Sequence, residues 1–471
     1  MTRFSLYTRF TIAALSLIVT FVSGTVFSDE MPDKLSLTDA VAMALQSNAS
    51  LQSARDSRLN SLSSLRIANI KTSINLGTTS YFEQNSYDKS SSSQLFGNAR
   101  YENLAGTQAS LNLTPMASGD DDNTVSLSLK HPLGKGRGLL SSKAIEVIGA
   151  RNSASIEEKQ LYLTTQSTVQ SVVQKYYGAV LAREQVKVQE QAVTIAKAVA
   201  DGAKKRAAEG LVAEIEASRA EIRVAQTENE LNVQKQAAEA ALDSLMIALG
   251  SGIGKKPELI EPIPEPSSIG NLPDLAAAME EALKNRAELD VYDTELSELS
   301  RTLAIAQDNL KPGLDLVASF YSSSDDTGLL SHSIWDAGNL TAGLEYSVPL
   351  DKRSLVERHS IAETNLQTKR RMRVYEMEQI AQQVREAYRD LQRANTTVDI
   401  YGQNLAVAED NLRMAQIRVD EGLTDNQEVL NAQEALTQVQ NSLISAKVSL
   451  YLAAVNLKCA MGEDLTIMGV K

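Results

Sequence analysis

Two stretches of the chain, residues 133–256 and 350–471, have the apolar spacing of very long helices. All ten prolines lie outside them, and a proline inside a helix costs about 3 kcal/mol. In the first stretch, apolar side chains recur every three or four residues, as at Val169, Val173, Tyr176 and Val180. In the second they recur every seven residues, at Leu391, Val398, Leu405, Leu412 and Val419. A sustained interval of seven predicts helices that pack side by side as in a coiled coil.

Each stretch contains one tripeptide, Glu-Gly-Leu, that is expected to end a helix, at 209–211 and again at 421–423. Glycine readily takes the left-handed conformation that terminates helices. We therefore predict two helical hairpins, with helices at 142–209 and 212–249, and at 354–421 and 425–461. A helix of about 60 residues is about 90 Å long, which is too long for an ordinary globular core.

The two stretches also match each other without a gap at an offset of 212 positions. Matching residues include Tyr176 and Tyr388, Arg206 and Arg418, Glu216 and Glu428, and Gly250 and Gly462. A duplication of this length predicts that each half of the chain builds the same supersecondary unit.

Ahead of each hairpin, apolar and polar residues alternate, which predicts strands with one apolar and one polar face. These segments are 74–82 and 125–130 in the first half, and 314–321 and 340–348 in the second. A polar segment, 85–124, separates the first two and contains a further strand-like stretch at 109–113. Either the strand of Ile74 pairs with that of Val125, or the strand of Ala109 does. We expect the first pairing, because it mirrors the second half.

The remaining segments complete the domain plan. Arg3 and Arg9 precede an apolar run, so residues 1–28 are predicted to be a signal peptide, with an uncleaved membrane anchor as the alternative. The first repeat is 29–256, a proline-rich extended linker is 257–273, and the second repeat is 274–471. Shorter helices, 37–69 and 274–309, open the two repeats. No other stretch has the length of a membrane-spanning helix, so we expect any membrane entry to be by strands.

Composition excludes several function classes. The net charge of −13 argues against nucleic acid as a partner. Cys459 is the single cysteine, so no disulfide forms within the chain. The three histidines are scattered, and Gly134, Gly136 and Gly138 have the context of a bend and not of a nucleotide loop. We expect no metal, no cofactor and no catalytic residues, hence no enzyme.

Several short motifs, in order, resemble those of the TolC family of outer-membrane efflux proteins. They are the opening Leu35–Val41 with Ala44 and Leu45, the segment Tyr176–Arg183, and the two Gly-Leu turns. The resemblance implies a mainly α fold with a membrane β-barrel part. In it, a homotrimer forms a long α-helical barrel continuous with a shared 12-stranded transmembrane β-barrel, to which each chain gives four strands. It also implies contact with outer-membrane lipid and a location in the bacterial outer membrane, extending into the periplasm.

The function implied by this resemblance is that of a passive exit duct. It would serve a tripartite efflux pump or a type I secretion system, coupled to an inner-membrane transporter through a periplasmic adaptor. Two alternatives are a periplasmic adaptor and a coiled-coil structural protein of the envelope without a pore. An adaptor would need a lipoyl-like β-sandwich around its hairpin and would not need amphipathic outer strands or a full duplication.

The resemblance also directs attention to the helix turns. In the family, two acidic residues ring the pore entrance, six and nine positions after the Gly of the second turn. Here Glu428 and Asn431 occupy those positions, so the second acid is replaced by Asn, and the repeat adds Glu216. A ring of carboxylates attracts cations; the alternative is an ordinary solvated surface glutamate. Docking of an adaptor's helical hairpin is expected at both turns, and plain helix capping is the compatible alternative. The docking residues are Glu209, Gly210, Leu211, Glu421, Gly422 and Leu423.

Overall fold

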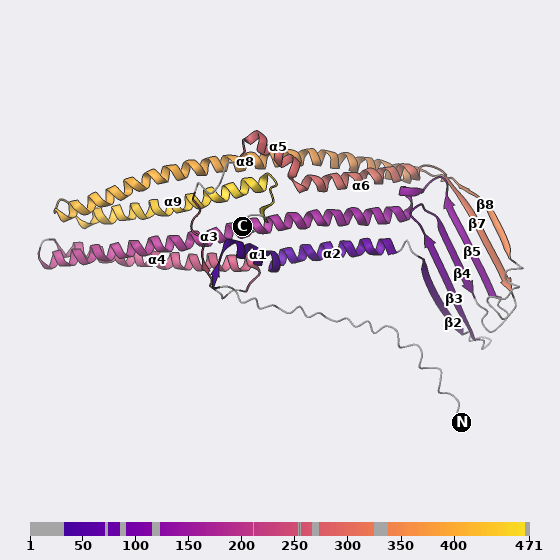
Figure 1. The fold of residues 1–471 in the computed structure, drawn as a ribbon, viewed down its shortest axis with the longest axis horizontal. Coiled ribbons are helices and arrows are strands. Elements are labelled where there is room, and N and C mark those ends of the chain that lie inside the picture. Colours follow the sequence, from indigo (N-terminus) through magenta and orange to yellow (C-terminus); the bar gives the residue numbers. More distant parts are fainter. Residues whose placement is uncertain are drawn as a thin grey trace, which may run out of the picture.

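The computed structural model describes residues 33–70, 74–84, 91–114, 123–210, 212–252, 254, 256–265, 273–324 and 338–466. The predicted signal peptide lies outside these residues. The molecule is elongated: its helices run along the long axis, with a β-sheet at one end and the two long-helix turns at the other (Figure 1).

Two helical hairpins form the length of the molecule. The first consists of α3 (Ser142–Ala208) and α4 (Glu214–Leu249), the second of α8 (Arg353–Asp420) and α9 (Asn426–Ala460). Their bounds confirm the predicted helices to within two residues. At about 1.5 Å per residue, α3 is about 100 Å long. Helix α3 packs on α9, so α4 and α8 lie at opposite edges of the helical layer (Figure 1).

Helix α9 departs from one expectation. By length and composition it is the one described helix that could cross a membrane, although no such stretch was expected. Its apolar window is 44% buried, and its buried side chains pack within the hairpins against α8 and α3. The apolar character of α9 therefore serves packing between helices.

The shorter helices that open each half are each broken into two. They are α1 (Leu37–Ser47) and α2 (Ala49–Ile70), then α5 (Leu275–Asn285) and α6 (Ala287–Asn309). At the first break, the Asn48 side-chain oxygen accepts hydrogen bonds from the N–H groups of Ser50 and Leu51, while its Nδ2 donates to the Ala248 carbonyl at 2.8 Å. One asparagine thus starts α2 and fixes it to the end of α4.

The end of α4 approaches this break so closely that only glycine fits. Gly250 has φ of 74°, and a Cβ there would lie 2.2 Å from the Ser47 carbonyl oxygen. In the second half, Gly462 packs in the same way against Asn285. Beside the first break, β1 (Lys34–Leu35) pairs in parallel with β6 (Glu258–Leu259), which fixes the start of the linker.

The hydrophobic core is thick only around these short helices. The largest cluster joins α1, α3, α4 and the linker strand through fully buried side chains such as Val41, Tyr176 and Leu249. A second cluster joins α5 to α8 and α9. Toward the turns, the seams contain alanines such as Ala203 and Ala415. Small side chains there allow the helices to pack closely over a long distance.

The strands form one antiparallel sheet of six described strands in the order β2-β3-β4-β5-β7-β8. Their bounds are β2 (Asn75–Gln84), β3 (Ser91–Glu102), β4 (Gln108–Thr114), β5 (Asn123–Pro132), β7 (Gly313–Ser324) and β8 (Asn339–Ser347). All four predicted strand segments are confirmed as β2, β5, β7 and β8.

The expected pairing in the first half is wrong. Val125 lies opposite Leu113 of β4, as the alternative required, although Ala109 itself pairs with Leu129. Strand β2 pairs with β3, which alternation did not predict because its apolar-face positions include the small Gly97 and Ala99. The described residues thus form six strands of this sheet, whereas four per chain were expected.

Candidate functional site at the helix turns

The two turns between the long helices have the same backbone geometry. Gly422 has φ of 72°; its N–H donates to the Val419 carbonyl at 3.1 Å, and that of Leu423 donates to the Arg418 carbonyl at 2.8 Å. These two bonds define the Schellman motif that closes a helix on a left-handed residue. Gly210 also has φ of 72°, and its N–H donates to Ala207. Capping by both glycines is thus present in the structure.

The described residues of the two turns are exposed at the surface of the molecule. Glu209 and Glu421 occupy the C-cap positions of α3 and α8, and both are exposed, as are the two glycines. Leu423 is 66% exposed, which is high for an apolar side chain at a tight turn. Leu211 lies outside the described residues.

Glu428 lies in the first turn of α9 and forms an ion pair across the second hairpin. Its carboxylate accepts a hydrogen bond from Arg418 Nη1 at 2.5 Å, and both side chains are partly exposed. Asn431 follows one turn later, is exposed, and accepts a hydrogen bond from Gln427 at 2.8 Å. Both residues line an open groove of about 590 Å³ along α8 and α9, next to Met414. The structure therefore brings Glu428 and Asn431 together.

Glu216 lies apart from these residues, on the other hairpin. It occupies the first turn of α4 and pairs with Arg219 of the same helix at 2.8 Å. An acidic residue at a helix N-terminus is favoured by the helix dipole, and the ion pair adds to this. The repeat therefore places Glu216 at the equivalent helical position but with a different cation.

Two contacts that the sequence did not predict join the hairpins near the turns. Arg206 Nη1 of α3 donates to the Val419 carbonyl of α8 at 3.2 Å. Farther from the turns, Arg223 of α4 forms an ion pair with Glu434 of α9. The only sequence signal for these contacts was the match between Arg206 and Arg418 in the repeat. That match did not indicate which residue Arg206 contacts. The two hairpins are thus held together by polar contacts at their free end.

Residues 278–463 match the family model described as Outer membrane efflux protein. The second half of the chain therefore carries the outer membrane efflux protein domain. This family consists of channel proteins of the outer membrane that extend into the periplasm, and the chain is assigned to the same location. No curated protein matches the chain.

Comparison with solved structures shows similarity over most of the length of the chain. The channel CusC has 16% sequence identity and a TM-score of 0.71, with 91% of this chain and 92% of CusC covered. VceC from Vibrio cholerae has 18% identity and a TM-score of 0.68, over 91% and 96% of the two chains. The open state of the Neisseria gonorrhoeae outer membrane channel MtrE has 13% identity and a TM-score of 0.68, over 91% and 89%. At these identities the likeness shows the fold.

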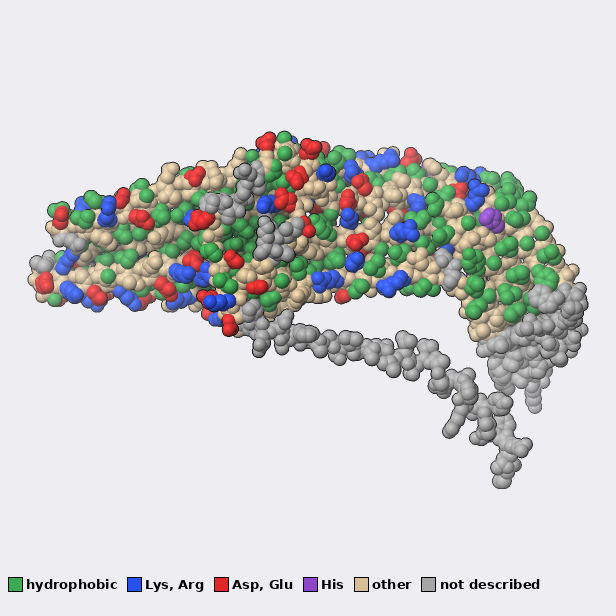
Figure 2. Space-filling view, in the orientation of Figure 1, with side chains coloured by type: hydrophobic (Ala, Val, Ile, Leu, Met, Phe, Trp, Pro, Cys, Tyr) green, Lys and Arg blue, Asp and Glu red, His purple; other side chains and the backbone are tan. Residues whose placement is uncertain are grey.

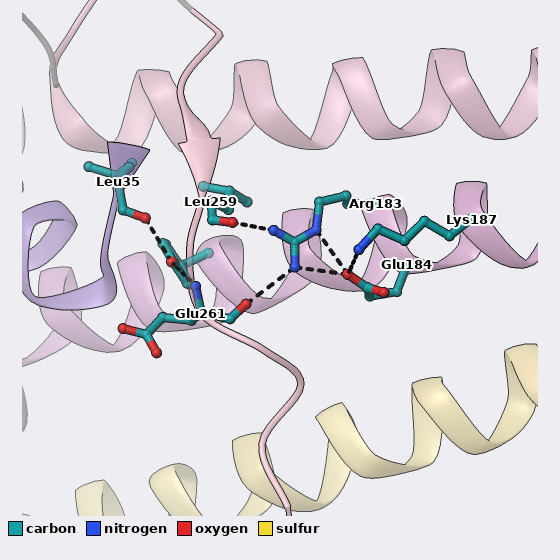
Figure 3. Close-up of polar contacts among 7 residues, drawn as sticks. Leu35, Arg183, Glu184, Lys187, Leu259 and Glu261 are labelled. Atoms are coloured by element: carbon teal, nitrogen blue, oxygen red, sulfur yellow. Dashed lines mark hydrogen bonds and ion pairs between the residues drawn. The ribbon is translucent and has the colours of Figure 1, made fainter. Parts of the chain in front are cut away.

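The segment Tyr176–Arg183 has a structural role that the motif alone did not reveal. The Tyr176 hydroxyl donates to the Leu35 carbonyl at 2.9 Å and accepts a hydrogen bond from the Glu261 N–H at 3.3 Å. Arg183 donates to the carbonyls of Leu259 and Glu261 (Figure 3). Both side chains extend from α3 and hold the start of the linker against the helices.

Glu184 completes this linker clamp, defined as Tyr176, Arg183, Glu184 and Lys187. Its carboxylate lies 2.8 Å from Arg183 and 2.8 Å from Lys187. Burial opposes its ionisation, but hydrogen bonds from Lys187 and Arg183 outweigh burial, and the pKa of Glu184 is lowered. Cys459 differs, since burial raises the pKa of its thiol and disfavours the reactive thiolate.

Proposed function

We propose that this protein is a passive outer-membrane exit duct for an efflux pump or a type I secretion system. One observation carries the proposal: a sheet with a solvent-exposed apolar face caps a helical body about 100 Å long. An exposed apolar face of this size is unfavourable in water and suits the hydrocarbon of a membrane. The long helices then lie outside the membrane, with their turns farthest from it.

The helices support assembly with further copies of the chain. Exposed apolar residues recur every seven positions on α8, at Ile400, Val407 and Met414, and two lie seven apart on α4, at Ile215 and Ile222. Helices α4 and α8 form the two edges of the helical layer (Figure 1), so each has one side without a partner in the chain. Seven-residue stripes at both edges fit side-by-side packing between copies, and we propose a homotrimer that encloses a tube.

The two turns then become the periplasmic entrance of the duct. We propose that Gly210, Gly422, Leu423 and their neighbouring glutamates receive a periplasmic adaptor, which couples the duct to an inner-membrane transporter. Glu428, Asn431 and Glu216 are proposed to influence ion passage at this entrance. The contacts Arg206–Val419 and Arg223–Glu434 would keep the entrance narrow, because they hold the two hairpins together.

Purified protein in detergent and in planar bilayers tests this function. We expect a trimer by mass measurement and stepwise conductance after insertion. A monomer, or a trimer that never conducts, would contradict the duct. A soluble monomer that binds an inner-membrane transporter would instead favour an adaptor, and a non-conducting fibre or bundle would favour a structural coiled-coil protein.

A further inference from the structure

The sheet presents one continuous apolar face across all six described strands. Because antiparallel partners share a face, the register aligns Leu76, Ala99, Leu111, Leu127, Phe320 and Leu340 in one row. The edge residues Leu76 and Leu340 are 82% and 76% exposed. Hydrophobic side chains dominate the visible strands in Figure 2, whereas charged side chains are spread over the helices. Strands β3 and β4 therefore share the apolar face of the sheet with the other four strands.

The opposite face of the sheet is polar and cross-linked by hydrogen bonds. Ser110 bonds to Ser128 at 2.7 Å between β4 and β5. Lys130 of β5 forms ion pairs at 2.9 Å with Asp315 of β7 and Glu345 of β8. A wall with one apolar and one polar face is typical of a membrane barrel with a water-filled interior. The polar contacts cover β4 as well as the strands that sequence alternation predicted.

The turn between β3 and β4 is fixed to the helical body. The Asn103 side-chain oxygen accepts hydrogen bonds from the N–H groups of Ala105 and Thr107. Ser141, the buried N-cap of α3, donates its hydroxyl to the Leu104 carbonyl at 2.8 Å. This turn thus lies at the helix end of the sheet, where strands of a barrel meet the tube. The segment that separates β2 from β5 is not an external excursion.

We propose that the assembled barrel contains eighteen strands, six from each of three copies, with β8 of one copy paired to β2 of the next. This inference rests on the proposed trimeric duct. Strands β2 and β8 are the edges of the described sheet, and open edges do not occur in hydrocarbon. The partner is a second copy of this chain, because six strands are fewer than the eight of the smallest membrane barrels.

Direction and position both suit this pairing. In a six-stranded antiparallel sheet the first and last strands run in opposite directions, so β8 meets β2 of a neighbour as an antiparallel pair. The two have similar lengths, 10 and 9 residues. Figure 1 also places β8 on the side of α8, and β2 on the side of α2 and α4. The same neighbour can therefore meet both the edge helix and the edge strand.

The number of strands determines the bore. Barrel diameter grows roughly in proportion to strand number, so eighteen strands give a barrel about one and a half times as wide as twelve. Barrels of about 16–18 strands leave an aqueous channel. We therefore expect the outer-membrane part of this duct to be wide, which leaves the helix turns as its narrow point.

Cysteine cross-linking between edge strands tests the proposal in the full-length protein, with Cys459→Ser as background. Leu344→Cys on β8 is combined with Leu76→Cys or Thr78→Cys on β2, all on the apolar face. A second pair, Leu344→Cys with Leu113→Cys on β4, tests whether β8 meets β4 of a neighbour instead. The control pair is Leu344→Cys with Leu127→Cys on the interior strand β5. Assembly is first measured by mass in detergent, and the oxidised samples are then separated on denaturing gels.

We expect a ladder ending at the covalent trimer for the β8–β2 pairs only, at least tenfold above the control. Cross-linking of the β8–β4 pair would overturn the proposal, because the β2–β3 hairpin would then lie outside a twelve-stranded barrel. Intact, conducting trimers that cross-link at neither pair would also overturn it while leaving the duct in place. A monomeric mass would instead remove the duct itself, and the inference with it.

Discussion

The two long-helix turns share a tripeptide and a glycine conformation, yet their acidic residues are paired differently. In the second hairpin, Glu428 pairs with Arg418 on the opposite helix. In the first, the equivalent Glu216 pairs with Arg219 on its own helix. The repeat places Asn431 where the first half has Arg219. One substitution between the halves thus gives the first acid a local cation and leaves the second to bind across its hairpin.

This difference has a consequence for how the hairpins are joined. Arg206 is the counterpart of Arg418, and it donates to the Val419 carbonyl on the other hairpin. A duplicated sequence therefore builds two turns with the same glycine conformation but different contacts. The first hairpin donates the hydrogen bond that joins the hairpins, and the second accepts it at Val419.

The largest expected effect follows from disrupting the shared backbone of the turns. In Gly422→Glu, a side chain must take the left-handed conformation at a cost of about 1–2 kcal/mol, and a charge is added to the exposed docking surface. We expect cargo export to fall at least about tenfold, with trimer mass unchanged. Leu423→Asp should act in the same direction. Export is measured in cells that lack the native protein.

Gly402→Glu is the matched control, because Gly402 is exposed on α8 and a Cβ there meets no atom within 4 Å. Gly210→Glu extends the test to the first turn. Equal export by Gly422→Glu and the control would remove the docking assignment for the second turn.

The sequence predicted regular features better than contacts. The long helices followed from proline exclusion and from seven-residue spacing, both of which act within one helix. The break at Asn48 did not, since it depends on a hydrogen bond to Ala248, 200 residues away. Strand β3 was missed because Gly97 fills an apolar-face position without an apolar side chain. The ion pair of Glu428 was equally hidden, because Arg418 precedes it by ten residues on another helix.

The second prediction exchanges the residues that distinguish the turns. In Arg219→Asn, Glu216 loses its local cation and competes for Arg206, which weakens the bond to Val419. Exposed charged contacts contribute about 0.5–1 kcal/mol, so the entrance should open about two- to fivefold more often. Single-channel recording in planar bilayers measures this. Asn431→Arg is the reciprocal variant, expected to draw Glu428 away from Arg418 without changing the opening frequency. Equal behaviour of both variants would contradict this difference between the turns.

A smaller effect is expected on ion selectivity. Glu428→Gln removes a carboxylate and leaves Arg418 as an unbalanced cation, so the preference for cations over anions should fall about twofold. Asn431→Asp should raise it. Both effects should be largest at low salt, because charges farther apart than about 10 Å are screened at about 0.1 M. Reversal potentials of purified trimers under a salt gradient report the ratio. Unchanged selectivity in both variants would place these residues on the solvated outer face.

The smallest effect concerns the linker clamp, where the halves also differ: Tyr176 has its counterpart in Tyr388, but Arg183 corresponds to Asn395. In Arg183→Asn the linker carbonyls lose their charged donor. Amide exchange in 258–263 should then accelerate about twofold, for a loss of about 0.5 kcal/mol, while conductance stays unchanged.

The folded chain lowers the pKa of Glu184, so its stabilising effect is full above the ordinary glutamate pKa. That effect is lost as pH falls through the lowered value. The protection of these amides, taken as the exchange rate relative to the intrinsic rate at each pH, should therefore fall on acidification in the native protein and less so in Glu184→Gln. Identical acid responses in the two proteins would show that another group controls the linker.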